Sequence, residues 1–152
     1  MKPLVAYGST MHGSEKIAKY IASKYGVEAL ELNRVNVSNL ENTNFAIFVI
    51  ATFGNGSFPQ NSQAFAEMLS YSSIDLSQLK FAELALGSSH YQYFCKAGDD
   101  LYKMLTDRGA KEIIPYVQSD KCMNDYGESV IEQFKKDITN FDLIQKAFQS
   151  AT

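Results

Sequence analysis

The segment 45–51 reads Phe-Ala-Ile-Phe-Val-Ile-Ala and constrains the fold more than any other part of the sequence. A run of apolar residues without a charge is typical of a strand that other elements cover on both faces. Such a strand belongs inside a parallel sheet, whose strands are joined by helical crossovers. Shorter apolar or alternating runs predict four further strands, at 4–7, 27–32, 81–86 and 113–117.

Helical patterns lie between these runs. Apolar residues recur at intervals of three or four, and they predict helices that begin at Ser14, at Asn61 or Ser62, before Ala97 and at Glu128. Ser14 is the predicted N-cap of the first of them. The segment Ser38–Glu41 has the pattern of a capping box and predicts one short helical turn. Pro115 has no backbone N–H, which places the strand 113–117 at an edge.

This alternation predicts a single α/β domain over residues 1–152, a length that suits one domain. We expect three layers, with a five-stranded parallel sheet of order 2-1-3-4-5 between helices. In such a sheet, ligands bind beyond the carboxyl ends of the strands, where the strand order reverses. Three loops, 8–14, 52–60 and 86–95, should therefore converge on one site.

Composition excludes several classes of function. The chain has 14 Lys and Arg against 17 Asp and Glu, so a strongly cationic nucleic-acid surface is not expected. Neither is a membrane span, because no apolar run approaches the roughly 20 residues that one needs. Cys95 and Cys122 form neither a disulfide framework nor a metal motif. A reduced, cytoplasmic protein is the simplest expectation.

The first loop, 8–14, reads Gly-Ser-Thr-Met-His-Gly-Ser and leads into a predicted helix. Small residues let backbone N–H groups approach an anion, and the helix start adds positive potential. The hydroxyls of Ser9, Thr10 and Ser14 add donors, so the loop is a candidate phosphate cradle. It has neither the P-loop ending nor the GxGxxG spacing, which disfavours nucleoside triphosphates and dinucleotides. The alternative is an ordinary turn with a helix cap.

The other two loops carry aromatic residues in uncharged surroundings. Phe53 and Tyr91 each follow a predicted strand, and an exposed aromatic ring there can stack on a flat heterocycle. Packing against neighbouring helices is the alternative, and it is the more natural prediction for Phe58 and Phe94. Cys95 is expected to pack as a small buried residue. The three loops together suit a phosphorylated flat ring, and flavin mononucleotide (FMN) fits that description.

Two histidines, His12 and His90, lie in these loops, but no catalytic arrangement with them can be predicted. The topology is shared with response-regulator receivers, which need carboxylates at the ends of the first and third strands. Here those ends read Ala6-Tyr7-Gly8 and Ile50-Ala51-Thr52, so a phosphoacceptor function is excluded.

The same three segments resemble the flavodoxins, most closely short-chain bacterial flavodoxins of the MioC type. Residues 8–15 are similar to their G-S-T-x-x-G-[AS]-E phosphate loop, although many flavodoxins have T-G where this chain has Met11-His12. Residues 52–61 and 86–95 resemble segments shared with the flavodoxin-like domains of diflavin reductases. The resemblance runs in order along nearly the whole chain.

The resemblance implies a carrier of single electrons with FMN as its cofactor, and not an enzyme. Phe53 and Tyr91 match positions that flank the isoalloxazine ring, and Gly54 matches the peptide that turns when the flavin N5 is protonated. Asp120 lies where related domains place an acid near the flavin. The full set of expected cofactor-binding residues is Ser9, Thr10, Met11, His12, Gly13, Ser14, Thr52, Phe53, Gly54, Asn55, Gly56, Gly87, Ser88, His90, Tyr91, Phe94, Cys95 and Asp120.

The partners that the resemblance implies are a flavin or iron–sulfur reductase as electron donor and a redox enzyme as acceptor. Biotin synthase is the family-level candidate for the acceptor. Two alternatives stay open from sequence: a non-redox binding module that has lost FMN, and a flavin-dependent reductase of small molecules. The loops 52–60 and 86–95 contain no Asp or Glu, so we also expect weak electrostatic steering of partners.

Overall fold

Strand β3 (Phe45–Ala51) lies at the centre of a parallel sheet, as its uncharged sequence predicts. It pairs with β1 (Leu4–Gly8) on one side and with β4 (Lys80–Gly87) on the other, and β2 (Ala29–Glu31) flanks β1. The predicted strand order 2-1-3-4-5 is confirmed in this computed structural model, which describes residues 2–151 and the side chains of residues 2–140.

The last strand differs from the prediction. We expected one strand over 113–117, but β4 pairs with two short strands, β5 (Lys111–Glu112) and β6 (Val117–Asp120), so the sheet has six strands. The interruption falls around Pro115, which has no N–H to donate to a ladder. The nearby N–H of Tyr116 donates to the Glu112 carboxylate at 2.9 Å instead.

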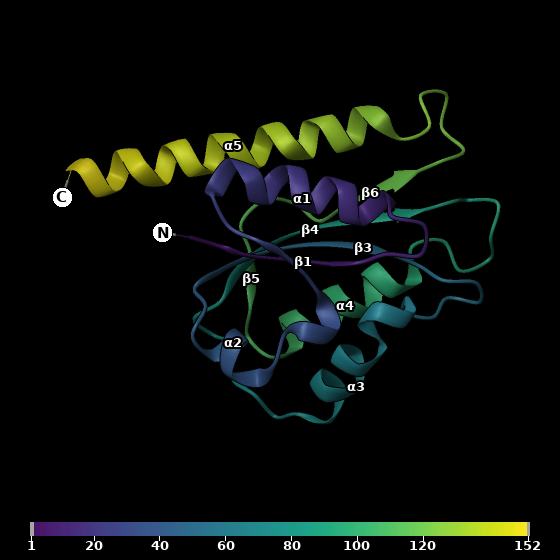
Figure 1. Ribbon diagram of the computed structural model, residues 1–152, viewed down its shortest axis with the longest axis horizontal. Coiled ribbons are helices and arrows are strands. Elements are labelled where there is room, and N and C mark those ends of the chain that lie inside the picture. The colour runs from purple at the N-terminus through teal and green to yellow at the C-terminus, as the bar shows by residue number, and fades with distance from the viewer. Residues whose placement is uncertain (1, 152) are drawn as a thin grey trace.

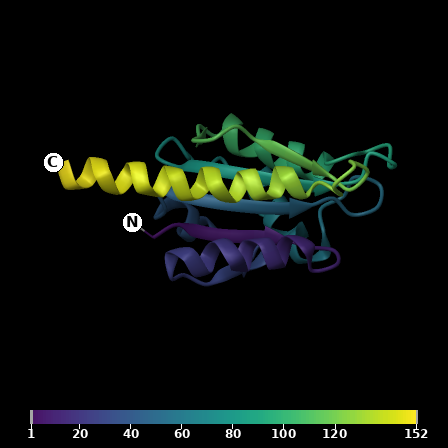
Figure 2. The same ribbon diagram turned by 90° about the horizontal axis from the view of Figure 1, so that it is seen from above.

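Helices cover both faces of the sheet (Figures 1 and 2). On one face lie α1 (Gly13–Tyr25) and α5 (Glu128–Ala151). The other carries α2 (Val37–Glu41), α3 (Gln63–Tyr71) and α4 (Lys96–Asp107), with short 3-10 turns at Leu32–Arg34 and Gln60–Ser62. Each face has its own apolar core, and its large buried side chains include Phe48, Phe65, Phe81 and Leu101 on the α3–α4 face and Ile47, Leu84 and Phe134 on the α1–α5 face.

Two predicted helix starts are wrong. The cap of α1 is His12, in the left-handed region with φ of 67°, while Ser14 lies inside the helix and its hydroxyl donates to the Gly8 carbonyl at 2.6 Å. The capping box of α2 is formed by Asn36 and Asn39, not by Ser38. At α2, Asn36 supplies the capping acceptor that the sequence pattern assigned to serine, whereas at α1 the His12 side chain makes no capping hydrogen bond.

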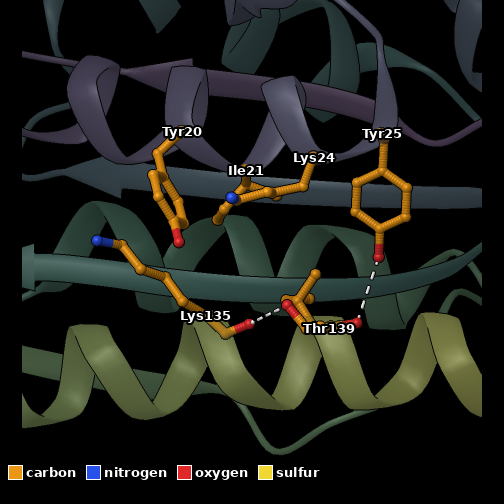
Figure 3. A pocket seen from close by; sticks show the side chains of 7 residues that line it. Tyr20, Ile21, Lys24, Tyr25, Lys135 and Thr139 are labelled. Atoms are coloured by element: carbon orange, nitrogen blue, oxygen red, sulfur yellow. Dashed lines mark hydrogen bonds between the residues drawn. The ribbon is translucent and has the colours of Figure 1, made fainter.

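Helix α5 is fastened to α1 by tyrosine contacts (Figure 3). The Lys135 ammonium lies 4.3 Å from the centroid of the Tyr20 ring, and the Lys24 ammonium lies 5.0 Å from the same centroid. The hydroxyl of Tyr25 donates to the Ile138 carbonyl at 3.3 Å. A groove of about 350 Å³ runs between these side chains. The apolar spacing of the α5 sequence also predicts that Phe141 faces inward, but its side chain lies outside the described residues.

No helix in the described part of the chain combines the length and the apolar character that crossing a bilayer would require.

Candidate functional site

Four loops gather at the carboxyl ends of the strands, at the end of the molecule opposite both chain termini (Figure 1). They follow β1, β3, β4 and β6, and three of them are the loops whose convergence the sequence predicts. A cavity of about 530 Å³ lies between them. Its lining residues are Thr10, Met11, Gly13, Thr52, Phe53, Gly54, Leu86, Gly87, Ser88, Tyr91, Tyr93, Phe94, Cys95 and Lys121.

The loop after β1 presents unpaired donors. Across the described residues, the backbone N–H groups of Thr10, Met11 and His12 donate to no acceptor, and the helix α1 begins directly after them. The Ser9 hydroxyl oxygen is buried and has no hydrogen-bond partner, whereas the Ser9 N–H donates to Asn61 Oδ1 at 3.0 Å. A buried polar atom without a partner is costly unless a ligand satisfies it. This loop is therefore built to receive an acceptor-rich group.

Two members of this loop behave differently from the prediction. Ser14 is buried, and its hydroxyl proton is used by the Gly8 carbonyl, so it fixes the loop instead of offering a free donor. The exposed His12 side chain lies 3.5 Å from the Glu15 carboxylate and does not line the cavity. His12 has a positive φ of 67°, so the chain turns there into the first turn of α1.

The loop after β3 is a tight turn that carries Phe53. The Phe53 N–H donates to the Ser57 carbonyl at 2.8 Å, and the Phe53 carbonyl accepts from Gly56 and Ser57. These bonds hold the Phe53 ring in an exposed position on the cavity wall, with 56% of its surface open. Gly54, at φ of 47°, has open space around it, so its backbone is free to turn. The predicted alternative, Phe53 packed against a helix, is not what the structure shows.

The loop after β4 presents Tyr91 to the same cavity. Tyr91 is 66% exposed, and its N–H donates to the Ser88 carbonyl at 3.1 Å. Phe94 is half-buried against the α3–α4 core and also contributes to the wall. Cys95 is fully buried, as expected, and burial raises the pKa of its thiol to about 12. Gly87 is needed beside it, because an added Cβ would lie 2.9 Å from the Cys95 sulfur.

Asp120 lies at the end of β6 and fastens two loops together without lining the cavity. Its carboxylate accepts from the N–H groups of Ser89 and Cys122, each at 2.9 Å. These hydrogen bonds to the charged form lower the pKa of Asp120. The next residue, Lys121, does line the cavity, and its N–H donates to the Gly87 carbonyl at 2.9 Å.

The predicted residues that do not line the cavity are Ser9, His12, Ser14, Asn55, Gly56, His90 and Asp120. Among them, Ser9, Ser14 and Asp120 make hydrogen bonds that fix the loops in place. Three lining residues were missed: Leu86, Tyr93 and Lys121. Leu86 and Tyr93 lie within the predicted loop 86–95 but are not among the predicted binding residues. Lys121 carries no sequence signal of its own, since only the fold places the end of β6 at this cavity.

The fold and the site together define the class: this is a doubly wound α/β protein with a ligand cavity at the carboxyl ends of its strands. A model of the flavodoxin family matches residues 5–134, so this chain belongs to the flavodoxin family. Flavodoxins bind FMN and are electron carriers. The fold agrees with solved flavodoxins: oxidised flavodoxin 1 from Bacillus cereus has a TM-score of 0.75 at 23% identity, covering 92% of this chain and 98% of that one.

The curated relatives differ in how much of their own length the match covers. The MioC homolog of Haemophilus influenzae is 31% identical over 130 residues, which are 84% of this chain and 89% of that protein. The sulfite reductase (NADPH) flavoprotein alpha-component of Shewanella sp. (strain MR-7) is 32% identical over 140 residues. That match covers 88% of this chain but 22% of the Shewanella protein. The mitochondrial pyruvate dehydrogenase (NADP(+)) of Euglena gracilis is 32% identical, and the match covers 6% of its length.

Proposed function

We propose that this chain binds FMN in the cavity at the carboxyl ends of its strands and carries single electrons between two redox proteins. One observation carries the proposal. A loop with unpaired N–H donors and a buried unpaired hydroxyl lies at the same cavity as two exposed aromatic rings on separate loops. A phosphorylated planar ring satisfies both features at once.

The loop after β1 fits the FMN phosphate. The N–H groups of Thr10 to His12 and the Ser9 hydroxyl are donors that need an acceptor, and the start of α1 favours negative charge. Ser14 would hold the loop in shape through its bond to Gly8. No Lys or Arg of this loop is required, which agrees with its sequence.

The two aromatic loops fit the isoalloxazine ring. Phe53 and Tyr91 would cover its faces, and Thr52, Gly54, Gly87 and Ser88 would border its edge. FMN supplies the chemistry, because it accepts and releases electrons one at a time. The chain's own task is to orient the ring, to exclude water from its faces, and to let the Gly54 peptide offer either its carbonyl or its N–H. The Thr52 hydroxyl accepts a hydrogen bond from the Ala97 N–H at 3.0 Å. This bond connects the end of β3 to the start of α4.

The proposal extends to the partners and the setting. A flavin or iron–sulfur reductase would deliver the electron and a redox enzyme would receive it, with biotin synthase as the candidate that the MioC resemblance suggests. We take residues 1–152 to form one FMN-binding domain with no catalysis of its own. Both cysteines are free thiols, which suits a reducing compartment such as the cytoplasm.

Visible absorption of the purified protein tests the proposal. We expect a yellow protein with flavin bands, and chromatography of the released cofactor should give FMN at one per chain. Reduction by a flavin reductase should be fast, while oxidation of NADH by the protein alone should be negligible. A protein that stays colourless after incubation with FMN would support the non-redox binding module. Rapid oxidation of NADH without a partner would instead support a small-molecule flavin reductase.

A further inference from the structure

Glu83 is a carboxyl group in the middle of β4 with no exposed surface. It pairs with Phe48 of β3 and shares the α4-facing side of β4 with Phe81 and Ala85. Neither of its side-chain oxygens has a hydrogen-bond partner. An ionised carboxylate in such a place is very unfavourable, so the side chain holds its proton and is neutral.

The groups around Glu83 also disfavour its ionised form. Burial is the main cause that raises its pKa well above the ordinary value, and Asp99 and Glu112 raise it further. The other titratable groups that face it are Cys95, Tyr102 and Tyr116. All five neighbours are acids. The Tyr116 and Tyr102 hydroxyls donate to Asp99 and Glu112, at 2.7 and 2.9 Å, so they offer Glu83 no donor.

Helix α4 seals this carboxyl group at its first turn. A Cβ added to Gly98 would lie 2.4 Å from Ala85 Cβ, 2.8 Å from the Tyr116 hydroxyl and 3.3 Å from Glu83 Oε2. The helix backbone therefore rests directly on the Glu83 carboxyl group, with no side chain between. The tightest of these contacts are with Ala85 and the Tyr116 hydroxyl, so a glycine at position 98 lets α4 pack closely over the part of β4 that holds Glu83.

The sealed acid lies close behind the cavity wall. Gly87 is four residues farther along β4 on the same face, a separation of about 13 Å at the usual rise of a strand. Cys95 lies beside Gly87 and lines the cavity; burial is the main cause that raises the pKa of its thiol, and the contribution of Glu83 is the smallest. Ala85 lies between Glu83 and Gly87 on this face of β4 and is fully buried, so a charge in the cavity acts on Glu83 through the protein interior.

We propose that Glu83 is a proton-binding site coupled to the cavity, and that it holds its proton more tightly after an electron enters the bound cofactor. This inference rests on the proposed function. At a pH where part of the Glu83 population is ionised, the electron passes from the reductase to FMN, and a proton from the solvent binds one oxygen of the ionised Glu83 carboxyl group. When the acceptor enzyme takes the electron, that O–H bond breaks and the proton returns to water. Glu83 thus exchanges a proton with the solvent and carries no electron. Only the cofactor and its redox partners would be oxidised or reduced.

The size of the coupling follows from Coulomb's law. A unit charge about 13 Å away, at an effective dielectric constant of about 20, shifts a proton-binding midpoint by about one pH unit. The shift applies in the pH range where Glu83 titrates. Below that range the group is neutral in both redox states, and the coupling vanishes.

Carbon-13 NMR of protein with labelled glutamate side chains reads the Glu83 carboxyl directly, and Glu83→Gln assigns its signal. We expect Glu83 to titrate far above the exposed glutamates, even before FMN is added. With FMN bound, its midpoint should rise by about one pH unit when dithionite reduces the protein. A Glu83 signal that titrates with the exposed glutamates overturns the inference, as does a midpoint that stays in place on reduction.

The reduction potential of bound FMN provides the second readout. Between the two Glu83 midpoints, the wild-type potential should fall more steeply with pH than that of Glu83→Gln, whereas Glu41→Gln, an exposed change on α2, should keep the wild-type slope.

If Glu83→Gln does not fold, Asp99→Asn serves, because it removes a neighbouring charge but keeps the acceptor for Tyr116. It should lower both midpoints, and unchanged midpoints contradict the inference. A protein that takes up no FMN refutes the proposed function as well, whereas one that binds FMN without coupling refutes only this inference.

Discussion

The carboxylate of Asp120 accepts a hydrogen bond from the backbone N–H of Ser89 at 2.9 Å, and so joins the end of β6 to the loop after β4. The same oxygen accepts from the Cys122 N–H. One ionised side chain thus positions the loop that carries Tyr91 and the segment that carries Lys121. Both segments line the cavity, although Asp120 does not.

Replacing Asp120 with Ala should loosen both loops and weaken FMN binding, as measured by a higher dissociation constant in fluorescence titration. The pKa of Asp120 is lowered in the folded protein, from an ordinary value of 3.8, so its contribution is present above that value. It is lost as pH falls through the lower, folded value. FMN affinity should therefore drop more steeply below pH 3.8 in the wild type than in Asp120→Ala. Equal affinities at neutral pH would contradict the positioning role.

Tyr91→Ala should weaken FMN binding by about 1–3 kcal/mol if the tyrosine stacks on the ring, by analogy with aromatic–base stacking. The dissociation constant would then rise about 5- to 150-fold. Tyr71→Ala is the matched control, since Tyr71 is 90% exposed on α3 and does not line the cavity. A Tyr91 variant that binds FMN like this control would show that the ring lies elsewhere.

Gly54→Val should narrow the separation between the two one-electron reduction potentials of bound FMN. The residue lies at φ of 47° with open space around it, so the substitution changes backbone freedom and creates no clash. Its cost in stability should be about 1–2 kcal/mol. Gly26→Val, at φ of 66° and also in open space at the end of α1, matches that cost without altering the cavity. Identical potentials in the two variants would count against a role for the Gly54 peptide.

Glu83→Gln should change how stability depends on pH. Because the pKa of Glu83 is raised in the folded protein, its effect on stability does not depend on pH below the ordinary value of 4.5, where the unfolded chain is also protonated. As pH rises from there through the folded pKa, the free energy of unfolding falls because only the unfolded state ionises freely. Urea denaturation across this range should show a flatter profile for Glu83→Gln. The same slope in both proteins would place the Glu83 carboxyl in water.

Electron transfer to a purified flavodoxin reductase should depend weakly on ionic strength. The loops 52–60 and 86–95 contain no acidic residue, and six exposed apolar side chains lie on the four cavity loops: Met11, Phe53, Tyr91, Tyr93, Met123 and Tyr126. Stopped-flow rates should change by less than about tenfold with salt, the lower end of what steering gives. Adding charge through Ser57→Glu and Gln92→Glu should steepen the dependence. A steep dependence in the wild type would mean that distant charges guide the partner.

Sequence patterns were sufficient for the sheet order and for the loops that form the cavity, because strand burial and switch-point geometry are encoded in local hydrophobicity. They failed where one local interaction competes with another. Pro115 divides the last strand because it lacks an N–H, and the pattern of apolar residues does not report that break. Ser14 looks like a cap, yet the left-handed turn at His12 moves it inside the helix. Lys121 reaches the cavity only through pairing of β6 with β4, a contact between distant segments.

The gathering of the four loops at the end away from both termini has a practical consequence. An affinity tag, a fluorescent protein or a surface anchor attached at either end of the chain would lie away from the loops that line the cavity. The same geometry suits a module that is tethered within a longer polypeptide and keeps these loops accessible to another protein.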